Sequence, residues 1–262
     1  MVVFADQRPK LPESLTQDVS DWVYNLRFED LSPEVLSSVK RVCLHFIAVA
    51  LAGSSGKGVG ATKRSGVQPL LQFAKLYPGS CTVMGTTVTS SPQYAALANG
   101  TFGHALTLQD THRGSVPTHI GATVYPAAFA ASQMMATDFP TFATSVAVGF
   151  EITAKLAMAL RPGHGTIDTI QANCLGAAAQ MAKHFGLNRQ QVADCLGIAT
   201  FLASGTFEFL TEPGYWCRSP QVGWAAHNGI IAALLAKEGL RGSPRILEAP
   251  YGFLNSFSVA PD

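Results

Sequence analysis

Apolar and polar positions alternate with the helical period along most of this chain. Residues 14–27 show it first, with a serine cap before apolar side chains at helical spacing: Leu15, Val19, Trp22, Val23 and Leu26. A helix over 33–52 is predicted because Ser32 followed by Pro33 is a typical helix start. Further helices are predicted over 91–108, 122–136, 141–160, 169–186, 189–205 and 221–238. The pattern therefore predicts an all-α fold.

One segment departs from the helical period. Residues 80–88, SCTVMGTTV, place β-branched side chains around Gly85, so a hairpin over 81–88 is predicted as the only regular β-structure. Alanine- and glycine-rich runs at 175–182 and 223–236 predict helices in close backbone contact. No repeat or linker divides the chain, and irregular structure is expected only after Gly239. Residues 1–262 are therefore predicted to form a single helical domain.

Composition limits the assemblies, partners and cellular compartments that are expected for this chain. Hydrophobic residues reach 47% and charged residues only 13%, which favours a homodimer that covers apolar surface. A net charge of +1 without a basic block argues against nucleic acid as a partner. The five cysteines are scattered without zinc spacing, which indicates a reducing compartment. The start has no secretory signal, and the apolar stretch 42–52 is judged too short to span a membrane. A cytoplasmic protein without a membrane partner is expected.

The chemistry is concentrated in residues 103–127, GHALTLQDTHRGSVPTHIGATVYPA. This segment carries three of the chain's seven histidines and one carboxylate: His104, His112, His119 and Asp110. Gly114, Ser115 and Pro117 break it into a loop between two apolar helices. Imidazoles and a carboxylate on such a loop are typical of acid–base chemistry, and we expect a small-molecule site here.

Five motifs in order resemble the MmgE/PrpD family, which includes 2-methylcitrate dehydratase and cis-aconitate decarboxylase. They are the Gly-His-Ala-Leu…Asp-Thr-His loop, His-Ile-Gly-Ala-Thr-Val-Tyr-Pro from 119, Leu-Gly-Ala-Ala-Ala from 175, Gly-Trp-Ala-Ala-His-Asn-Gly from 223 and Leu-Glu-Ala-Pro-Tyr-Gly-Phe-Leu from 247. The resemblance covers nearly the whole chain from about residue 15 and implies the family's multi-helix domain with one short β-hairpin. It also implies a homodimer and no cofactor or metal. The family's smaller α+β lid domain would start where the chain stops, at Asp262.

The resemblance implies a site of a loop aspartate, two histidines and a lysine around a citrate-like acid. Here the candidate catalytic residues are His119, Asp110 and His112. The candidate substrate-binding residues are Thr107, Gln109, Thr111, Trp216, Arg218 and Gln221. Each has a structural alternative: His119 could cap the following helix, Asp110 could accept backbone hydrogen bonds, and His112 could be solvated. Trp216 belongs to an aromatic loop that could line the pocket or cover an interface.

Several positions depart from the family pattern. Thr107 and Gln109 stand where aspartates are expected, and Ile167 stands where the second histidine is expected, with His164 displaced from it. The basic stretch before Gly-Trp-Ala-Ala reads Arg-Ser-Pro-Gln, from Arg218 to Gln221. Arginine keeps a charge suited to a carboxylate but does not donate a proton at neutral pH.

These departures leave three functions open. The sequence favours an isomerase or cyclase that shapes a carboxylate- or carbonyl-bearing metabolite in a largely apolar pocket, by preorganisation as in a Diels–Alderase of secondary-metabolite biosynthesis. The alternatives are a lyase of the family's own type, dehydratase or decarboxylase, and a non-catalytic partner. Because partner groups around His119 are missing, the sequence predicts only a modest loss of turnover when one polar group is removed.

Overall fold

The computed structural model describes residues 11–56, 67–114, 117–160, 168–206 and 218–258. Within them the elements, in chain order, are α1 (Leu15–Asn25), the 3-10 turn η1 (Phe28–Asp30), α2 (Pro33–Ser54), α3 (Val67–Lys75), β1 (Cys81–Thr82), β2 (Thr89–Ser90), α4 (Pro92–His104), α5 (Gly121–Met135), α6 (Phe139–Ala159), α7 (Asp168–His184), α8 (Arg189–Leu202), α9 (Gln221–Lys237) and α10 (Phe253–Phe257). The predicted all-α fold with one short hairpin is confirmed.

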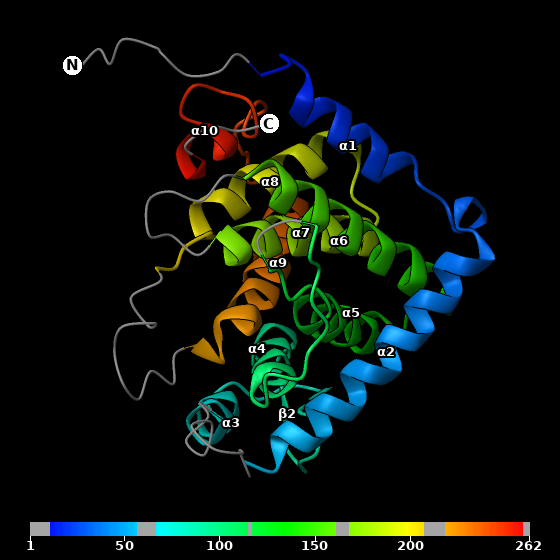
Figure 1. Cartoon of the computed structure of the whole chain (residues 1–262), viewed down its shortest axis with the longest axis vertical. Helices are drawn as coiled ribbons and strands as arrows, with labels where there is room; N and C mark the ends of the chain where they lie inside the picture. Colours follow the sequence, from blue (N-terminus) through cyan, green and yellow to red (C-terminus); the bar gives the residue numbers. More distant parts are fainter. Residues whose placement is uncertain (1–10, 57–66, 115–116, 161–167, 207–217, 259–262) are drawn as a thin grey trace.

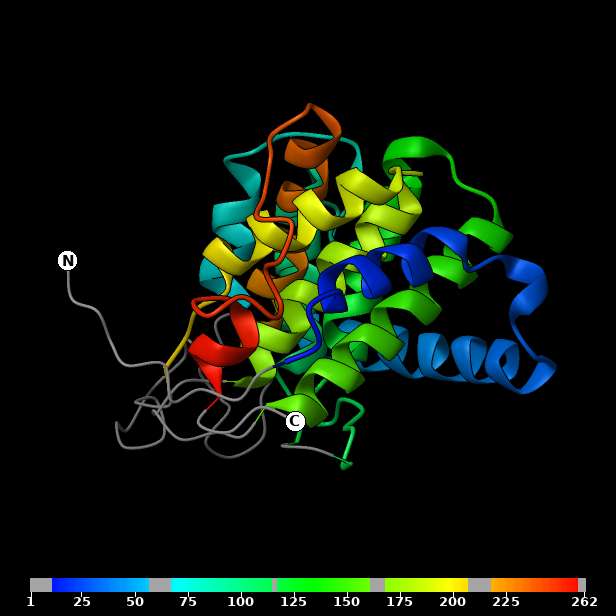
Figure 2. The same ribbon diagram turned by 90° about the horizontal axis from the view of Figure 1, so that it is seen from above.

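The helices form a bundle around α7, which packs against α6, α8 and α9 (Figure 1). A second packed group, α4 with α5 and α9, lies beside it and carries the loop of interest between α4 and α5. Figure 2 shows α2 running along one edge of the bundle. The alanine-rich faces of α7 and α9 are fully buried, as their small side chains predict.

Glycine at one crossing lets two helix backbones touch. A Cβ atom added to Gly223 of α9 would lie 2.3 Å from the carbonyl oxygen of Leu97 in α4. A Cβ added to Gly100 of α4 would lie 2.7 Å from the Gly223 Cα atom. No larger residue fits between these backbones, so the α4–α9 contact depends on this pair.

Most predicted helices occur within a few residues of their expected bounds, and two short ones were missed. The missed helices are α3 and α10. The hairpin pairs β1 with β2 antiparallel, with Cys81 opposite Ser90, so its second strand begins beyond Val88. The helix predicted over 91–108 ends at His104, because Thr107 adopts a left-handed backbone with φ 57° and its N–H bonds to the His104 carbonyl.

The segment after Gly239 packs back onto α1. The buried carboxylate of Glu248 accepts hydrogen bonds from the backbone N–H of Thr16, at 3.1 Å, and from the Thr16 hydroxyl. Arg245 lies 3.8 Å from the other carboxylate oxygen. These contacts tie the two ends of the described chain together.

Two described helices, α2 and α6, are long and apolar enough to cross a membrane by length and composition. The stretch 42–52 judged too short is therefore part of a 22-residue helix, and length alone does not exclude a span. More than half of the apolar window of α6 is buried, as in the core helix of a soluble protein, but only 22% of that of α2 is buried. The outward side of α2 is consequently the least covered apolar surface among these helices.

Candidate active site

The loop between α4 and α5 is closed by a backbone bridge. The N–H of His112 donates to the Thr118 carbonyl at 2.9 Å, and the Thr118 N–H donates back to the His112 carbonyl at 3.2 Å. The bridge brings residues 110–112 alongside 118–121. Groups from both sides of the loop therefore meet at the N-terminal end of α5.

His119 is half-buried at the centre of this arrangement. Its Nδ1 lies 3.2 Å from the Asp110 carbonyl and 3.2 Å from the Thr111 hydroxyl. Asn173 of α7 donates to the His119 carbonyl at 3.5 Å. Burial lowers the pKa of His119 from its usual 6.5 and outweighs the Asp110 contacts, which raise it. These contacts orient the imidazole and favour its neutral form. The imidazole contacts the Asp110 carbonyl and the Thr111 hydroxyl, and no side-chain hydrogen bond caps α5, so His119 does not act as the cap of that helix.

Asp110 accepts a hydrogen bond from the backbone N–H of Gly121, the first residue of α5, at 3.0 Å. A Cβ at Gly121 would lie 2.4 Å from Oδ1 of Asp110, so a larger residue here would displace this carboxylate. Burial raises the pKa of Asp110, although the Gly121 hydrogen bond opposes the shift. The carboxyl thus has both a structural contact and a proton affinity suited to acid–base chemistry.

His104 is the group for which the sequence provided no role. It is the last residue of α4, is 2% exposed, and its ring centroid lies 5.2 Å from that of His119. Its Nδ1 lies 3.3 Å from the Ser219 carbonyl, while Nε2 has no hydrogen-bond partner among the described residues. Burial, with a smaller effect of neighbouring His119 and Arg218 in the same direction, lowers its pKa to about 3. The only signal in the sequence was its membership in the cluster of three histidines.

Three further predicted residues are candidates for substrate binding: Arg218, Gln109 and Gln221. Arg218 is half-buried and close enough to both imidazoles to lower their pKa values. Gln109 and Gln221 each have a buried Oε1 without a hydrogen-bond partner in the described part of the chain. Such amides are available to a ligand.

Of the other predicted residues of the loop, Thr111 lies beside His119, whereas His112 and Thr107 are placed differently. The imidazole of His112 lies against the turn of the loop, because a Cβ at Gly114 would be 3.0 Å from its Cε1. Thr107 is exposed in its left-handed conformation. Trp216, His164 and Ile167 lie outside the described residues. Within the described ranges, no three His, Cys, Asp or Glu side chains are grouped to hold a metal ion.

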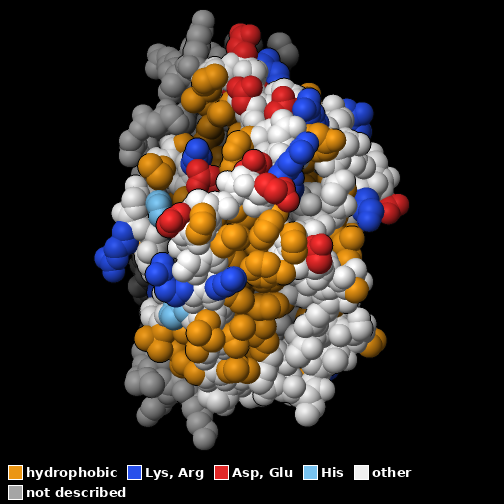
Figure 3. All heavy atoms as spheres, turned by 90° about the vertical axis from the view of Figure 1, so that its right-hand side faces the viewer, with side chains coloured by type: hydrophobic (Ala, Val, Ile, Leu, Met, Phe, Trp, Pro, Cys, Tyr) orange, Lys and Arg blue, Asp and Glu red, His pale blue; other side chains and the backbone are white. Residues whose placement is uncertain are grey.

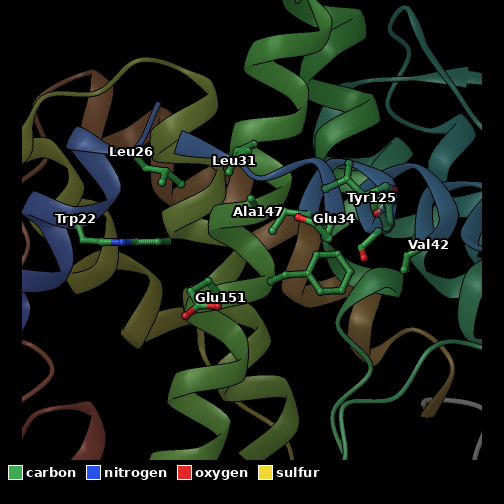
Figure 4. Close-up of a pocket in the computed structure, with 12 residues that line it drawn as sticks. Trp22, Leu26, Leu31, Glu34, Val42, Tyr125, Ala147 and Glu151 are labelled. Atoms are coloured by element: carbon green, nitrogen blue, oxygen red, sulfur yellow. Dashed lines mark hydrogen bonds between the residues drawn. The ribbon is translucent and has the colours of Figure 1, made fainter. Parts of the chain in front are cut away.

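A separate apolar groove of about 420 Å³ lies between α1, α2 and α6. Figure 4 shows Trp22, Leu26, Leu31 and Val42 around it, with Glu34 and Glu151 among the lining residues. Tyr125 of α5 also lines it and donates from its hydroxyl to the Val39 carbonyl at 2.7 Å. None of the histidines of the loop lines this groove.

Comparison of this sequence with known protein families and with known proteins leads to one family. Residues 17–262 match the description MmgE/PrpD N-terminal domain. The chain is 30% identical to the cis-aconitate decarboxylase of Aspergillus terreus, over 97% of this chain and 52% of that protein. It is 29% identical to a cis-aconitate decarboxylase-like protein of Aspergillus oryzae and 24% identical to human cis-aconitate decarboxylase, over 94% and 92% of this chain. The chain spans about half the length of the curated relatives it matches.

Proposed function

Because this chain belongs to the MmgE/PrpD family, we propose that it is a lyase for a small carboxylic acid of the cis-aconitate type, acting without a cofactor. The observation that carries the proposal is the position of His119, between the Asp110 peptide and His104 and close to Arg218. The names of the relatives support a lyase over the isomerase or cyclase that the sequence favours.

Each group has a chemical task in this proposal. The Arg218 guanidinium binds a carboxylate of the substrate and stabilises negative charge that develops beside it. Neutral His119 exchanges a proton with the carbon or oxygen that reacts. Asp110 holds His119 through its backbone carbonyl, and its carboxyl, with a raised pKa, is a second proton-exchanging group. A base, an acid and a cation that binds the substrate carboxylate are the minimum set of groups for dehydration or decarboxylation.

Two departures from the family pattern favour isomerisation or cyclisation as a second function. Thr107 stands in place of an acid, and Gln221, with its unpartnered Oε1, stands in place of a base. A site with fewer proton-transferring groups and more amide contacts is suited to folding a carbonyl-bearing substrate into a reactive shape. A non-catalytic partner role is the third outcome that the assay below distinguishes.

The 262-residue chain is expected to convert cis-aconitate or a citrate-like acid, with activity lost in acid. A neutral His119 is required, so activity is present above its pKa and disappears as the pH falls through that value, which lies below 6.5. The measurement is kcat/KM by proton NMR between about pH 4 and 8. Conversion only of neutral carbonyl substrates would favour the isomerase or cyclase, and no conversion at all would favour the partner role.

We further propose that two copies of the chain associate through the outward side of α2. Leu44 is 69% exposed there, with Leu51 at 48% and Val35 at 39%. The face seen in Figure 3, which includes α2, carries a continuous band of hydrophobic side chains. Apolar surface of this kind on a chain with few charges is typical of an interface between subunits.

Sedimentation at micromolar concentration is therefore expected to give a dimer, and Leu44→Glu is expected to shift it to monomer, because a carboxylate would be buried without a partner. Leu240→Glu, at a leucine that is also 50% exposed but lies after α9, is the control and is expected to remain dimeric. A parent chain that sediments as a monomer would refute the dimer, and an unchanged dimer in Leu44→Glu would move the interface away from α2.

A further inference from the structure

Aromatic and aliphatic side chains form the walls of the groove between α1, α2 and α6. Three of them are rings from three helices: Trp22 of α1, Tyr125 of α5 and Phe150 of α6. Trp22 is 39% exposed, whereas Tyr125 is fully buried and is held by its hydrogen bond to the Val39 carbonyl. The volume of about 420 Å³ lies within the range of pockets that bind small organic molecules, about 300–1,000 Å³. The groove therefore has the size and the surface that an apolar ligand requires.

Two carboxylates interrupt this apolar surface. Glu34, in the first turn of α2, and Glu151 of α6 both line the groove. In Figure 4 they lie between Trp22 on one side and Val42 on the other. A hydrogen bond with the Ser32 side chain lowers the pKa of Glu34, so this carboxylate is ionised at neutral pH. Negative charge therefore lies in the middle of the groove, with apolar surface to either side.

No basic side chain is among the described residues that line the groove. Two cations contact lining residues from outside it. Lys155 lies 3.1 Å from Glu151, in an i,i+4 pair whose lysine side chain is 70% exposed. Arg41 donates to the Ser38 hydroxyl at 3.4 Å. Because an exposed pair of this kind contributes little to stability, a cation in the groove can take the place of Lys155 beside Glu151.

We propose that this groove is a binding site for a small organic cation, an ammonium compound that carries alkyl or aryl groups. Its nitrogen lies between the carboxylates of Glu34 and Glu151, and its apolar groups cover the side chains at the two ends of the groove. The ammonium charge is attracted by the carboxylates and also by the faces of aromatic rings such as Trp22. The site is separate from the loop histidines and does not depend on the proposed lyase function.

Other classes of ligand fit this surface less well. A fatty acid would bring a third carboxylate beside Glu34 and Glu151 without a basic partner. A hydrated metal ion would leave the carbon walls uncovered, because hard cations prefer a shell of oxygen ligands. A charged centre with apolar groups around it is the ligand that matches both features of the groove.

Calorimetric titration of the 262-residue chain with hexyltrimethylammonium chloride at neutral pH tests the site. Hexanoate and hexanol have the same alkyl chain without the positive charge. The ammonium compound is expected to bind at least about ten-fold more tightly than either of them, because only it contacts both the carboxylates and the apolar walls. Equal affinity for the three compounds, or no binding of the ammonium compound at millimolar concentration, would overturn the proposal.

Glu34→Gln and Glu151→Gln keep the shape of the groove and remove one charge each. Each is expected to weaken the binding of hexyltrimethylammonium about three- to ten-fold. The matched control is Glu238→Gln, at an exposed carboxylate directly after α9 that does not line the groove, and it is expected to bind like the parent. Equal losses in all three variants would indicate a general attraction to acidic side chains and would contradict a site in the groove.

Filling the groove tests the position of the ligand. Ala147 of α6 is a half-buried lining residue, and Ala147→Phe is expected to abolish the binding of hexyltrimethylammonium while circular dichroism shows a folded chain. Unchanged binding in a folded Ala147→Phe chain would overturn the proposal, and if this variant does not fold, the two glutamine variants still decide. Binding seen only in Leu44→Glu would mean that a second copy covers the groove of the parent chain, which would make it a protein interface and not a ligand site.

Discussion

Replacing His119 by alanine is expected to reduce kcat/KM for the carboxylic acid substrate by about 100-fold or more. The reason is the convergence on this ring of the Asp110 carbonyl, the Thr111 hydroxyl and the neighbouring imidazole of His104. The matched control is His112→Ala, in the same loop, whose imidazole lies against Gly114. The control is expected to lose less than about ten-fold, and steady-state kinetics at neutral pH measure both.

This expectation is larger than the modest loss that the sequence predicts for His119. The sequence shows that partner groups are missing at Thr107, Ile167 and Gln221, but it does not show that His104 lies beside His119. Full activity in His119→Ala would place the site elsewhere. A loss of only a few-fold would favour catalysis by substrate preorganisation, as in the isomerase or cyclase.

Substitution of Gly223 by alanine is expected to lower the free energy of unfolding by about 3 kcal/mol, or to prevent folding. The added methyl group would lie 2.3 Å from the Leu97 carbonyl oxygen, which is fixed in α4. Relief requires α4 and α9 to separate, and this would also disturb the site, because α4 carries His104 and the residues before α9 include Ser219. Urea denaturation followed by circular dichroism measures the change.

Ala48→Ser is the control for this substitution, since it also adds one heavy atom to a helix but at an exposed position of α2. It is expected to change the free energy of unfolding by no more than about 0.5 kcal/mol. Equal stability of the parent and the Gly223→Ala chain would mean that the two helices are not in backbone contact.

Local signals in the sequence were sufficient for most of the secondary structure. Ser32 and Pro33 start α2 as predicted, because capping and the fixed φ of proline act within one turn. The all-α class follows from the apolar period, and the alanine- and glycine-rich runs correctly indicated buried helix contacts. The loop with Asp110 and His119 was also located from residue types alone.

The composition of the candidate site was decided by tertiary structure. His112 is nearer to His119 in the chain than His104 is, but the ring shown in contact with His119 is that of His104. The partner of His104 is a carbonyl 115 positions away, at Ser219, and the amide that contacts the His119 carbonyl comes from Asn173. Spacing along a sequence describes neighbours on one helix or loop. The protonation of a buried imidazole depends on which carbonyls surround it in space, and these are set by how α4, α7 and α9 pack.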